Sequence, residues 1–209
     1  QLDKYQRRST EQQGSYLASR YFLYQLLSSY TGVNINQVNL IYSRLNKPSL
    51  HPNPANLYFN YTDTLFDGKG FGLYAFTLGR EIGVDIEFVG RKSNFSAITA
   101  RRFCSEEIAF ITKDGEVNPH RFLACWTRKE AYGKATGKGI NFKMNDINLS
   151  LNNNYQLNFD SVEENPQPYH LQQIQIDNKF ISSVVSQGHE KCTIHAYLIC
   201  IILVMRPWA

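Results

Sequence analysis

Apolar and polar side chains alternate along one short stretch near the middle of the chain. Ile82, Val84 and Ile86 are apolar, and the carboxylates of Asp85 and Glu87 occupy the polar positions beside them. A period of two predicts a half-buried β-strand whose successive side chains point to opposite faces. Both carboxylates are therefore expected on one face of this strand, two residues apart.

A second stretch, further along the chain, has the period of an α-helix. Trp126, Glu130 and Lys134 follow one another at intervals of four residues, so a helix would align them along one stripe. If this helix faces the strand, Glu130 joins Asp85 and Glu87, and three carboxylates that close cannot all stay ionised without a cation. The pattern predicts a divalent metal site. The alternative that spacing leaves open is a solvated Glu130–Lys134 salt bridge beside an exposed strand face.

Apolar spacing and turn residues predict the other elements. In chain order these are a helix over 15–30 ended by Gly32, a strand over 38–42, an irregular proline-containing loop over 46–54, strands over 57–61 and 71–76, helices over 94–104 and from Ser105, a loop over 114–119, a helix from Pro119 to about Gly137, and short strands over 147–151, 155–159, 170–176, 181–185 and 193–204. The strands over 57–61, 71–76 and 82–87 are expected to form an antiparallel meander. This order of elements predicts an α+β fold.

Composition narrows the class of protein. The chain has 209 residues, 43% of them hydrophobic, and a formal net charge of +4 without a basic run, so we expect a folded domain that does not bind nucleic acid. The apolar run over 196–205 is shorter than the roughly twenty residues needed to span a bilayer. The cysteines of the chain show no C-x-x-C spacing, which indicates reduced thiols rather than a zinc site. A cytoplasmic protein that does not associate with membranes is expected.

The predicted cluster suits phosphate chemistry. Magnesium binds a few carboxylates and completes its octahedron with water and substrate phosphates, and a lysine one helical turn beyond Glu130 can neutralise charge on a phosphate. Together with this cluster, three motifs resemble the 4′-phosphopantetheinyl transferases of the larger, monomeric Sfp type: Gly83-Val84-Asp85-Ile86-Glu87, Arg102-Phe103-Cys104-Ser105-Glu106-Glu107 and Trp126-Thr127-Arg128-Lys129-Glu130-Ala131 with Lys134. Upstream, Asn46-Lys47-Pro48 and Phe59-Asn60-Tyr61-Thr62-Asp63 are similar to the family's Gly-Lys-Pro and Phe-Asn-x-Ser-His.

This resemblance implies a fold and a reaction. Two similar α+β subdomains related by a pseudo-twofold axis are expected, residues 1–81 on the side of the coenzyme A adenine and 3′-phosphate, and residues 82–209 with the metal and catalytic groups. The implied enzyme is a monomer that transfers the 4′-phosphopantetheine arm of coenzyme A to a serine of an acyl or peptidyl carrier protein, releasing 3′,5′-ADP. Apolar side chains over 95–111 would be the docking surface for the carrier.

The resemblance also implies residue roles. Asp85, Glu87 and Glu130 would hold Mg²⁺ against the pyrophosphate, Glu130 would deprotonate the serine, and Lys134 would stabilise the departing 3′,5′-ADP. The remaining implied contacts to coenzyme A are a phosphate contact by Lys129 oriented by Glu107, Lys47 and Pro48 beside the adenine, Thr62 near the phosphates, and Arg7 and Arg8 near the 3′-phosphate.

Two departures from the family pattern keep other functions open. Thr62-Asp63 replaces Ser-His, and the negative charge of Asp63 would repel a pyrophosphate unless the side chain turns away or joins the metal's ligands. Basic residues near the N-terminus are also sparse. One alternative is a catalytically decayed relative that binds coenzyme A or a carrier protein, and another is a metal-dependent phosphohydrolase that uses the same three carboxylates.

Overall fold

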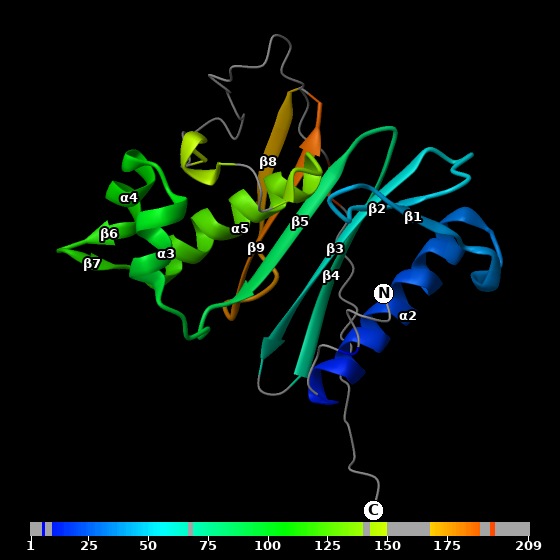
Figure 1. Ribbon diagram of the computed structural model, residues 1–209, viewed down its shortest axis with the longest axis horizontal. Helices are drawn as coiled ribbons and strands as arrows, with labels where there is room; N and C mark the ends of the chain where they lie inside the picture. The colour runs from blue at the N-terminus through cyan, green and yellow to red at the C-terminus, as the bar shows by residue number, and fades with distance from the viewer. Residues whose placement is uncertain are drawn as a thin grey trace, which may run out of the picture.

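A long helix, a pair of long strands and a mixed helical and stranded unit make up the computed structural model (Figure 1), which describes residue 6 and residues 10–66, 69–139, 143–149, 168–188 and 193–194. Helix α2 (Thr10–Thr31) begins earlier than expected and ends, as expected, at Gly32, whose φ of 69° suits glycine. Leu23 and Leu27 are fully buried in a core cluster with Leu57 and Phe59, because four-residue spacing places both leucines on one helix face.

The chain after α2 contains one strand more than the sequence indicated. A short 3₁₀ helix (Ile35–Gln37) leads to β1 (Leu40–Tyr42), which pairs antiparallel with β2 (Pro48–Leu50). The expected irregular loop over 46–54 is therefore wrong in part. Proline is tolerated at the first position of a strand, where no ladder hydrogen bond is lost. Strands β3 (Leu57–Phe66) and β4 (Lys69–Leu78) form a long antiparallel pair.

Strand β5 (Ile82–Phe88) pairs with β9 (Phe180–Gln187), which is the central strand of a three-stranded sheet, and β9 pairs in turn with β8 (Tyr169–Ile174). The expected meander is confirmed for the antiparallel pair β3 and β4 and is wrong for β5, because the hydrogen-bonded neighbour of β5 comes from the far end of the described chain. Strand β3 still lies beside β5, where the Asn60 side chain accepts a hydrogen bond from the Val84 amide at 3.0 Å. A side chain thus replaces the regular backbone ladder at this junction.

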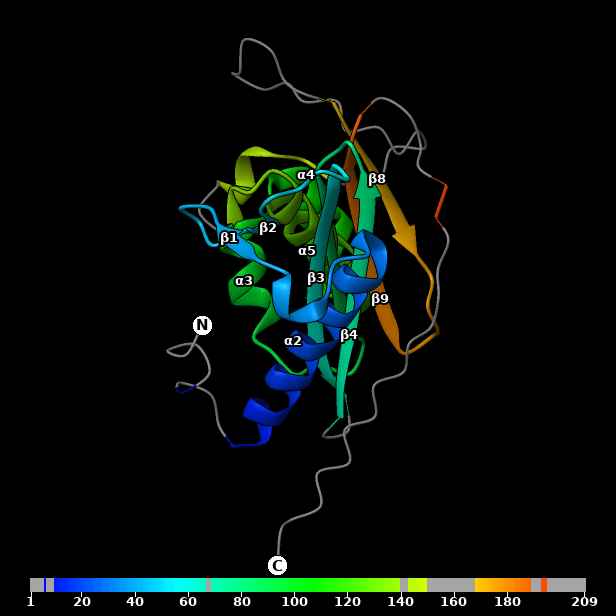
Figure 2. The same cartoon turned by 90° about the vertical axis from the view of Figure 1, so that its right-hand side faces the viewer.

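Helix α5 (Pro119–Ala135) covers one face of β5 and β9 (Figures 1 and 2). All residues from Ile82 to Ile86 are buried, so the expected half-buried strand is wrong: α5 covers the face that a period of two would leave to solvent. A Cβ on Gly83 would collide with the Ala131 carbonyl oxygen and the Ala135 backbone. Glycine therefore permits the close approach of helix and strand.

Between β5 and α5 lie two short helices and a small hairpin: α3 (Phe95–Arg102), α4 (Ser105–Ile111), β6 (Thr112–Lys113) and β7 (Glu116–Val117). The hairpin replaces part of the expected loop over 114–119. Cys104, rather than Ser105, is the N-cap of α4. A 3₁₀ helix, η3 (Met144–Asp146), follows α5. Phe103, Ile111 and Phe122 form the centre of a core cluster that joins these helices.

The α+β class is confirmed by the mixture of helices and antiparallel sheets. The pseudo-twofold axis and the division into residues 1–81 and 82–209 stay predictions. The expected strand over 155–159 and all but the first two residues of the one over 193–204 lie outside the described residues. So do Arg7, Arg8, Cys192 and Cys200, whereas Cys104 and Cys125 are free thiols. No helix within the described ranges is long and apolar enough to cross a membrane.

Candidate active site

Asp85 lies at the centre of the candidate site. Its side chain is buried in β5, and its Oδ1 accepts hydrogen bonds from Lys134 Nζ at 2.7 Å and from Thr62 Oγ1 at 3.1 Å. Lys134 also donates to the Val84 carbonyl oxygen at 3.1 Å. The three elements β3, β5 and α5 thus meet at one carboxylate. The solvated Glu130–Lys134 pair that spacing left open is not formed among the described ion pairs, because Lys134 turns to Asp85.

The second oxygen of Asp85 has no such partner. Oδ2 is buried and makes no hydrogen bond to any described residue. Burial raises the pKa of this carboxyl, and Lys134 and Thr62 oppose that rise. A buried carboxylate oxygen without a donor is costly, so this atom marks a position where a cation or a donor from a ligand would be stabilised.

Glu87 and Glu130 extend the acidic character of the site. Burial, with repulsion from Asp85 next, raises the pKa of Glu87 to about 7, although it pairs with Arg91 and accepts a hydrogen bond from Trp126. Burial and then Asp85 also raise the pKa of Glu130, which Lys134 moderates. The charge of Asp85 therefore acts on both Glu87 and Glu130.

A magnesium ion fits this arrangement only with a rearrangement of two basic side chains. No three His, Cys, Asp or Glu side chains in the described part of the chain are close enough to hold a metal. In this structure Lys134 forms an ion pair with Asp85, and Arg91 forms one with Glu87. The unpartnered oxygen of Asp85 and the raised pKa values of its neighbours nonetheless fit a divalent cation, which removes repulsion between carboxylates. The metal stays a prediction.

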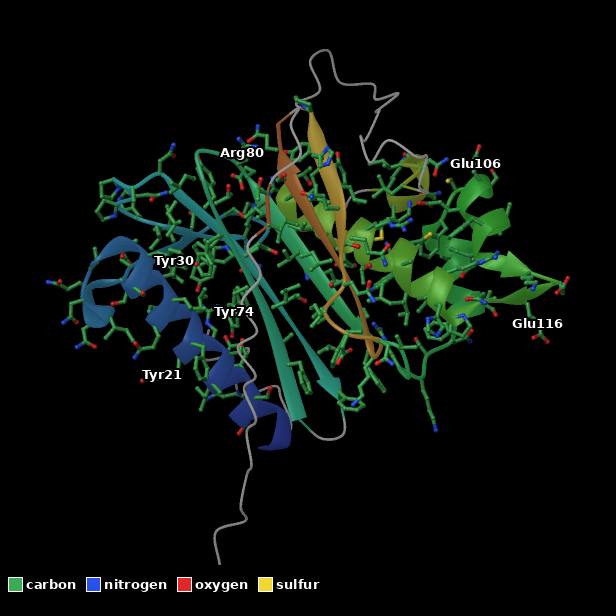
Figure 3. All side chains as sticks on the ribbon, turned by 180° about the vertical axis from the view of Figure 1, so that it is seen from behind. Tyr21, Tyr30, Tyr74, Arg80, Glu106 and Glu116 are labelled. Carbon is green, nitrogen blue, oxygen red and sulfur yellow. The ribbon has the colours of Figure 1, made fainter. Side chains whose placement is uncertain are left out.

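Thr62 and Asp63 point to opposite faces of β3. Thr62 is buried against Asp85, whereas Asp63 is exposed and lies opposite Gly72 of β4. On that side, Tyr74 donates a hydrogen bond to the Ser19 carbonyl at 2.9 Å, which joins β4 to α2 (Figure 3). Asp63 has therefore turned away from Asp85, as strand geometry requires for neighbouring residues.

Lys129 does not lie where a phosphate could reach it. Its side chain and that of Glu107 are fully buried, and they form an ion pair at 2.8 Å. The Lys129 ammonium also donates to the carbonyl oxygens of Met144 and Ile147. These three acceptors use all three of its donors. The pairing with Glu107 is the one that the resemblance implies. The implied phosphate contact would require the Lys129 ammonium to leave these partners, and it stays a prediction.

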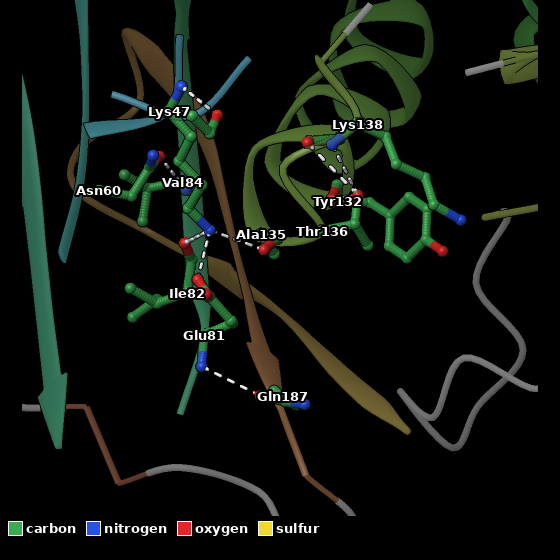
Figure 4. A network of polar contacts seen from close by, with 12 residues as sticks. Lys47, Asn60, Glu81, Ile82, Val84, Tyr132, Ala135, Thr136, Lys138 and Gln187 are labelled. Atoms are coloured by element: carbon green, nitrogen blue, oxygen red, sulfur yellow. Dashed lines mark hydrogen bonds and ion pairs between the residues drawn. The ribbon is translucent and has the colours of Figure 1, made fainter. Parts of the chain in front are cut away.

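Lys47 and Pro48 line a cavity of about 320 Å³ between β2, β3 and the start of β5, together with Ser43, Ser49, Asn53, Leu57, Tyr58, Phe59 and Glu81. This is the place the resemblance gives to the adenine. The Lys47 ammonium, however, points towards α5 and binds Glu81 and the Ala135 carbonyl (Figure 4).

Sequence reasoning missed three residues of this region. Glu81 precedes β5, and its position suggested only a turn. Arg91 follows β5, and although it lies four residues after Glu87, no helical pattern there indicated that the two side chains would meet. Arg20 hydrogen-bonds the phenols of Tyr42 and Tyr61. The sequence feature that could have indicated Arg20 is its position as a lone basic residue among the aromatic residues of α2.

Comparisons with known proteins identify the family of this chain. A model of the 4′-phosphopantetheinyl transferase superfamily matches residues 81–190, slightly more than half of the chain. The chain therefore belongs to that superfamily. The 4′-phosphopantetheinyl transferase HetI of Nostoc sp. is 33% identical over 144 residues, which cover 68% of this chain and 59% of HetI.

Two further matches are weaker. The Synechocystis sp. protein slr0495, named for the same activity, is 29% identical over 147 residues, 69% of this chain and 57% of its own. A crystal structure of the holo-[acyl-carrier-protein] synthase of Thermotoga maritima is 19% identical with a TM-score of 0.36, and the match covers 53% of this chain and 64% of that one. The chain thus spans less than three fifths of the length of the curated relatives named here.

Proposed function

We propose that this protein transfers the 4′-phosphopantetheine arm of coenzyme A to a serine hydroxyl of an acyl or peptidyl carrier protein. The observation that carries the proposal is the position of Asp85, whose unpartnered oxygen lies among Lys134, Thr62 and two further coupled carboxylates. Superfamily membership supports the same reaction. The products are the holo carrier protein and 3′,5′-ADP.

The chemical step follows from the groups around Asp85. The serine Oγ attacks the phosphorus that carries the pantetheine arm, the bond from that phosphorus to the oxygen of 3′,5′-ADP breaks, and the serine proton passes to Glu130. Serine is a weak nucleophile without a base, and burial and the charge of Asp85 raise the pKa of Glu130, which makes its carboxylate a stronger proton acceptor. The Lys134 ammonium leaves Asp85 to offset the negative charge that develops on the departing ADP.

Asp85, Glu87 and Glu130 would hold Mg²⁺, which would neutralise charge on the pyrophosphate when bound. Thr62 keeps Asp85 oriented through its hydrogen bond and lies near the phosphates. The cavity beside Lys47 and Pro48 takes the adenine. The 3′-phosphate contact stays assigned to Arg7 and Arg8, and we further propose that the enzyme acts as a cytoplasmic monomer.

One assay tests the proposal against its rivals. The protein is incubated with coenzyme A, Mg²⁺ and a panel of apo carrier proteins, and the carriers are weighed by mass spectrometry. A gain of one phosphopantetheine arm is expected, and EDTA, Asp85→Ala or Glu130→Gln should abolish it. Asp63→Asn is the matched control, because it removes an exposed carboxylate from the opposite face of β3.

The other outcomes separate the alternatives. Binding of coenzyme A without any change in carrier mass would support a catalytically decayed relative. Loss of coenzyme A without labelled carrier would support a phosphohydrolase that uses the same carboxylates. Either result with the full carrier panel would overturn the proposed transfer.

A further inference from the structure

Lys47 is held in place by a tight turn between β1 and β2. The Lys47 amide donates to Ser43 Oγ at 3.0 Å, and the Ser43 amide donates to the Lys47 carbonyl at 2.9 Å. Asn46, at the preceding position, has a φ of 65°, a conformation that asparagine tolerates better than most residues. The backbone at Lys47 is therefore held by the turn itself, independently of the contacts of the Lys47 ammonium.

The Lys47 ammonium crosses from this turn to the second half of the structure (Figure 4). It lies 2.5 Å from Glu81 Oε2, 2.7 Å from the Ala135 carbonyl oxygen and 3.5 Å from the Ile82 carbonyl oxygen. Its side chain is 16% exposed, against 38% for Glu81. These three acceptors match the three donors of an ammonium group, so little donor capacity remains for a ligand in the cavity.

Ala135 is the last residue of α5. The final carbonyl groups of a helix have no partner within the helix, and a positive charge beside them is favourable. Lys47 thus provides, from a distant part of the sequence, a cap for the end of α5. Lys134 is the adjacent residue, and its ammonium binds Asp85.

The end of α5 and strand β5 are in contact at Gly83, where a side chain would collide with the helix backbone. Lys47 binds the carbonyls on either side of this contact, Ile82 on the strand and Ala135 on the helix. Without the ammonium, both carbonyls and Glu81 would lose a donor in a partly buried place. The helix turn that carries Lys134 would then lose one of its contacts with β5 and keep those of Lys134 with Asp85 and the Val84 carbonyl.

From these contacts we infer that Lys47 is a positioning residue, which fixes the C-terminal turn of α5 against β5 and so sets the placement of Lys134 and Glu130 relative to Asp85. Its hydrocarbon stem forms part of the cavity wall, while its ammonium acts on the catalytic helix rather than on the ligand. The kinetic part of this inference rests on the proposed transfer reaction. Its structural part concerns the free protein.

The kinetic test compares Lys47→Met with Lys47→Arg. Methionine keeps most of the stem and loses all donors, so kcat should fall by about 10- to 100-fold, as a small misplacement of catalytic groups does, with a smaller change in KM for coenzyme A. Arginine retains donors for Glu81 and the Ala135 carbonyl and should restore most of kcat. The matched control is Lys143→Met, since Lys143 is 82% exposed and 4.0 Å from its partner Asp146.

The structural test uses hydrogen exchange in the free protein. The Thr136 amide donates to the Tyr132 carbonyl at 2.9 Å, and the Gly137 amide donates to the Lys134 carbonyl at 3.3 Å. In Lys47→Met both amides should exchange at least about tenfold faster, because local opening of the last helix turn becomes easier. In Lys47→Arg and Lys143→Met they should exchange as in the wild type. If Lys47→Met does not fold, Lys47→Leu, which also has no side-chain donor, replaces it with the same expectations.

Two results would overturn the inference. A raised KM for coenzyme A with unchanged kcat would mean that the ammonium contacts the ligand, and unchanged exchange at Thr136 and Gly137 would mean that it does not hold the helix end. If the wild-type protein labels no carrier, the proposed transfer fails, whereas the exchange comparison still tests the role of Lys47.

Discussion

Replacing Glu107 by glutamine removes the negative charge from a fully buried ion pair. Glu107 Oε2 lies 2.8 Å from Lys129 Nζ and accepts the Cys104 amide at 3.1 Å, and Oε1 accepts the Leu149 amide at 2.9 Å. Lys129 also binds two carbonyl oxygens of the segment that contains η3. The pair therefore joins α4, α5 and the chain that follows α5.

The cost of this change comes from the charge left behind. Lys129 has no exposed surface, and removing one partner of a buried ion pair costs about 3–5 kcal/mol, because the other charge stays desolvated without compensation. Lys129→Met should cost a similar amount for the same reason. The double variant leaves no unpaired charge, so it should be at least about 2 kcal/mol more stable than the sum of the two single effects predicts.

Urea unfolding of the wild type, the two single variants and the double variant measures this coupling. Lys143→Met combined with Asp146→Asn is the control, since that pair is exposed on both sides and 4.0 Å apart, and such pairs contribute little. Single-variant costs below about 1 kcal/mol that simply add would refute the buried-pair reasoning. A sharply raised KM for coenzyme A in Lys129→Met, with stability unchanged, would restore the phosphate contact.

Three further changes test other parts of the structure. Gly83→Ala should lower the free energy of unfolding by about 1–3 kcal/mol, because the new methyl group meets the Ala131 carbonyl; an unchanged melting temperature would mean that strand and helix are further apart. Glu87 has a pKa of about 7 in the folded protein against an ordinary 4.5, so between these pH values the folded state binds a proton that the unfolded state does not. In EDTA the free energy of unfolding should therefore fall by up to about 3 kcal/mol as pH rises from 4.5 to 7. Melting temperatures across that range should vary less in Glu87→Gln, and equal slopes would contradict the assignment. Asp63→His should leave coenzyme A affinity unchanged by calorimetry, since this side chain points away from Asp85; tighter binding would place it at the pyrophosphate.

Local patterns in the sequence were sufficient for most of the main elements and for the position of each candidate carboxylate on its strand or helix. Periods of two and of about four are set by backbone geometry, so they located Asp85, Glu87 and Glu130 on elements that could face each other. Helix α5 and its end at Gly137 followed from the same rules, through Pro119 at the first turn and glycine beyond the last. These features depend on interactions between residues close together in the chain, so the sequence alone is enough to predict them.

The tertiary structure decided which faces are covered and which charges meet. The second face of β5 is buried because α5 packs against it. The hydrogen-bonded partner of β5 is β9, which no local pattern indicated. The ammonium groups of Lys129 and Lys47 reach acceptors distant in sequence, Glu107 for Lys129 and the Ala135 carbonyl for Lys47, and motif position did not indicate the second of these contacts. The role of a charged side chain depends on what desolvates and pairs it, and those groups are brought together by the fold.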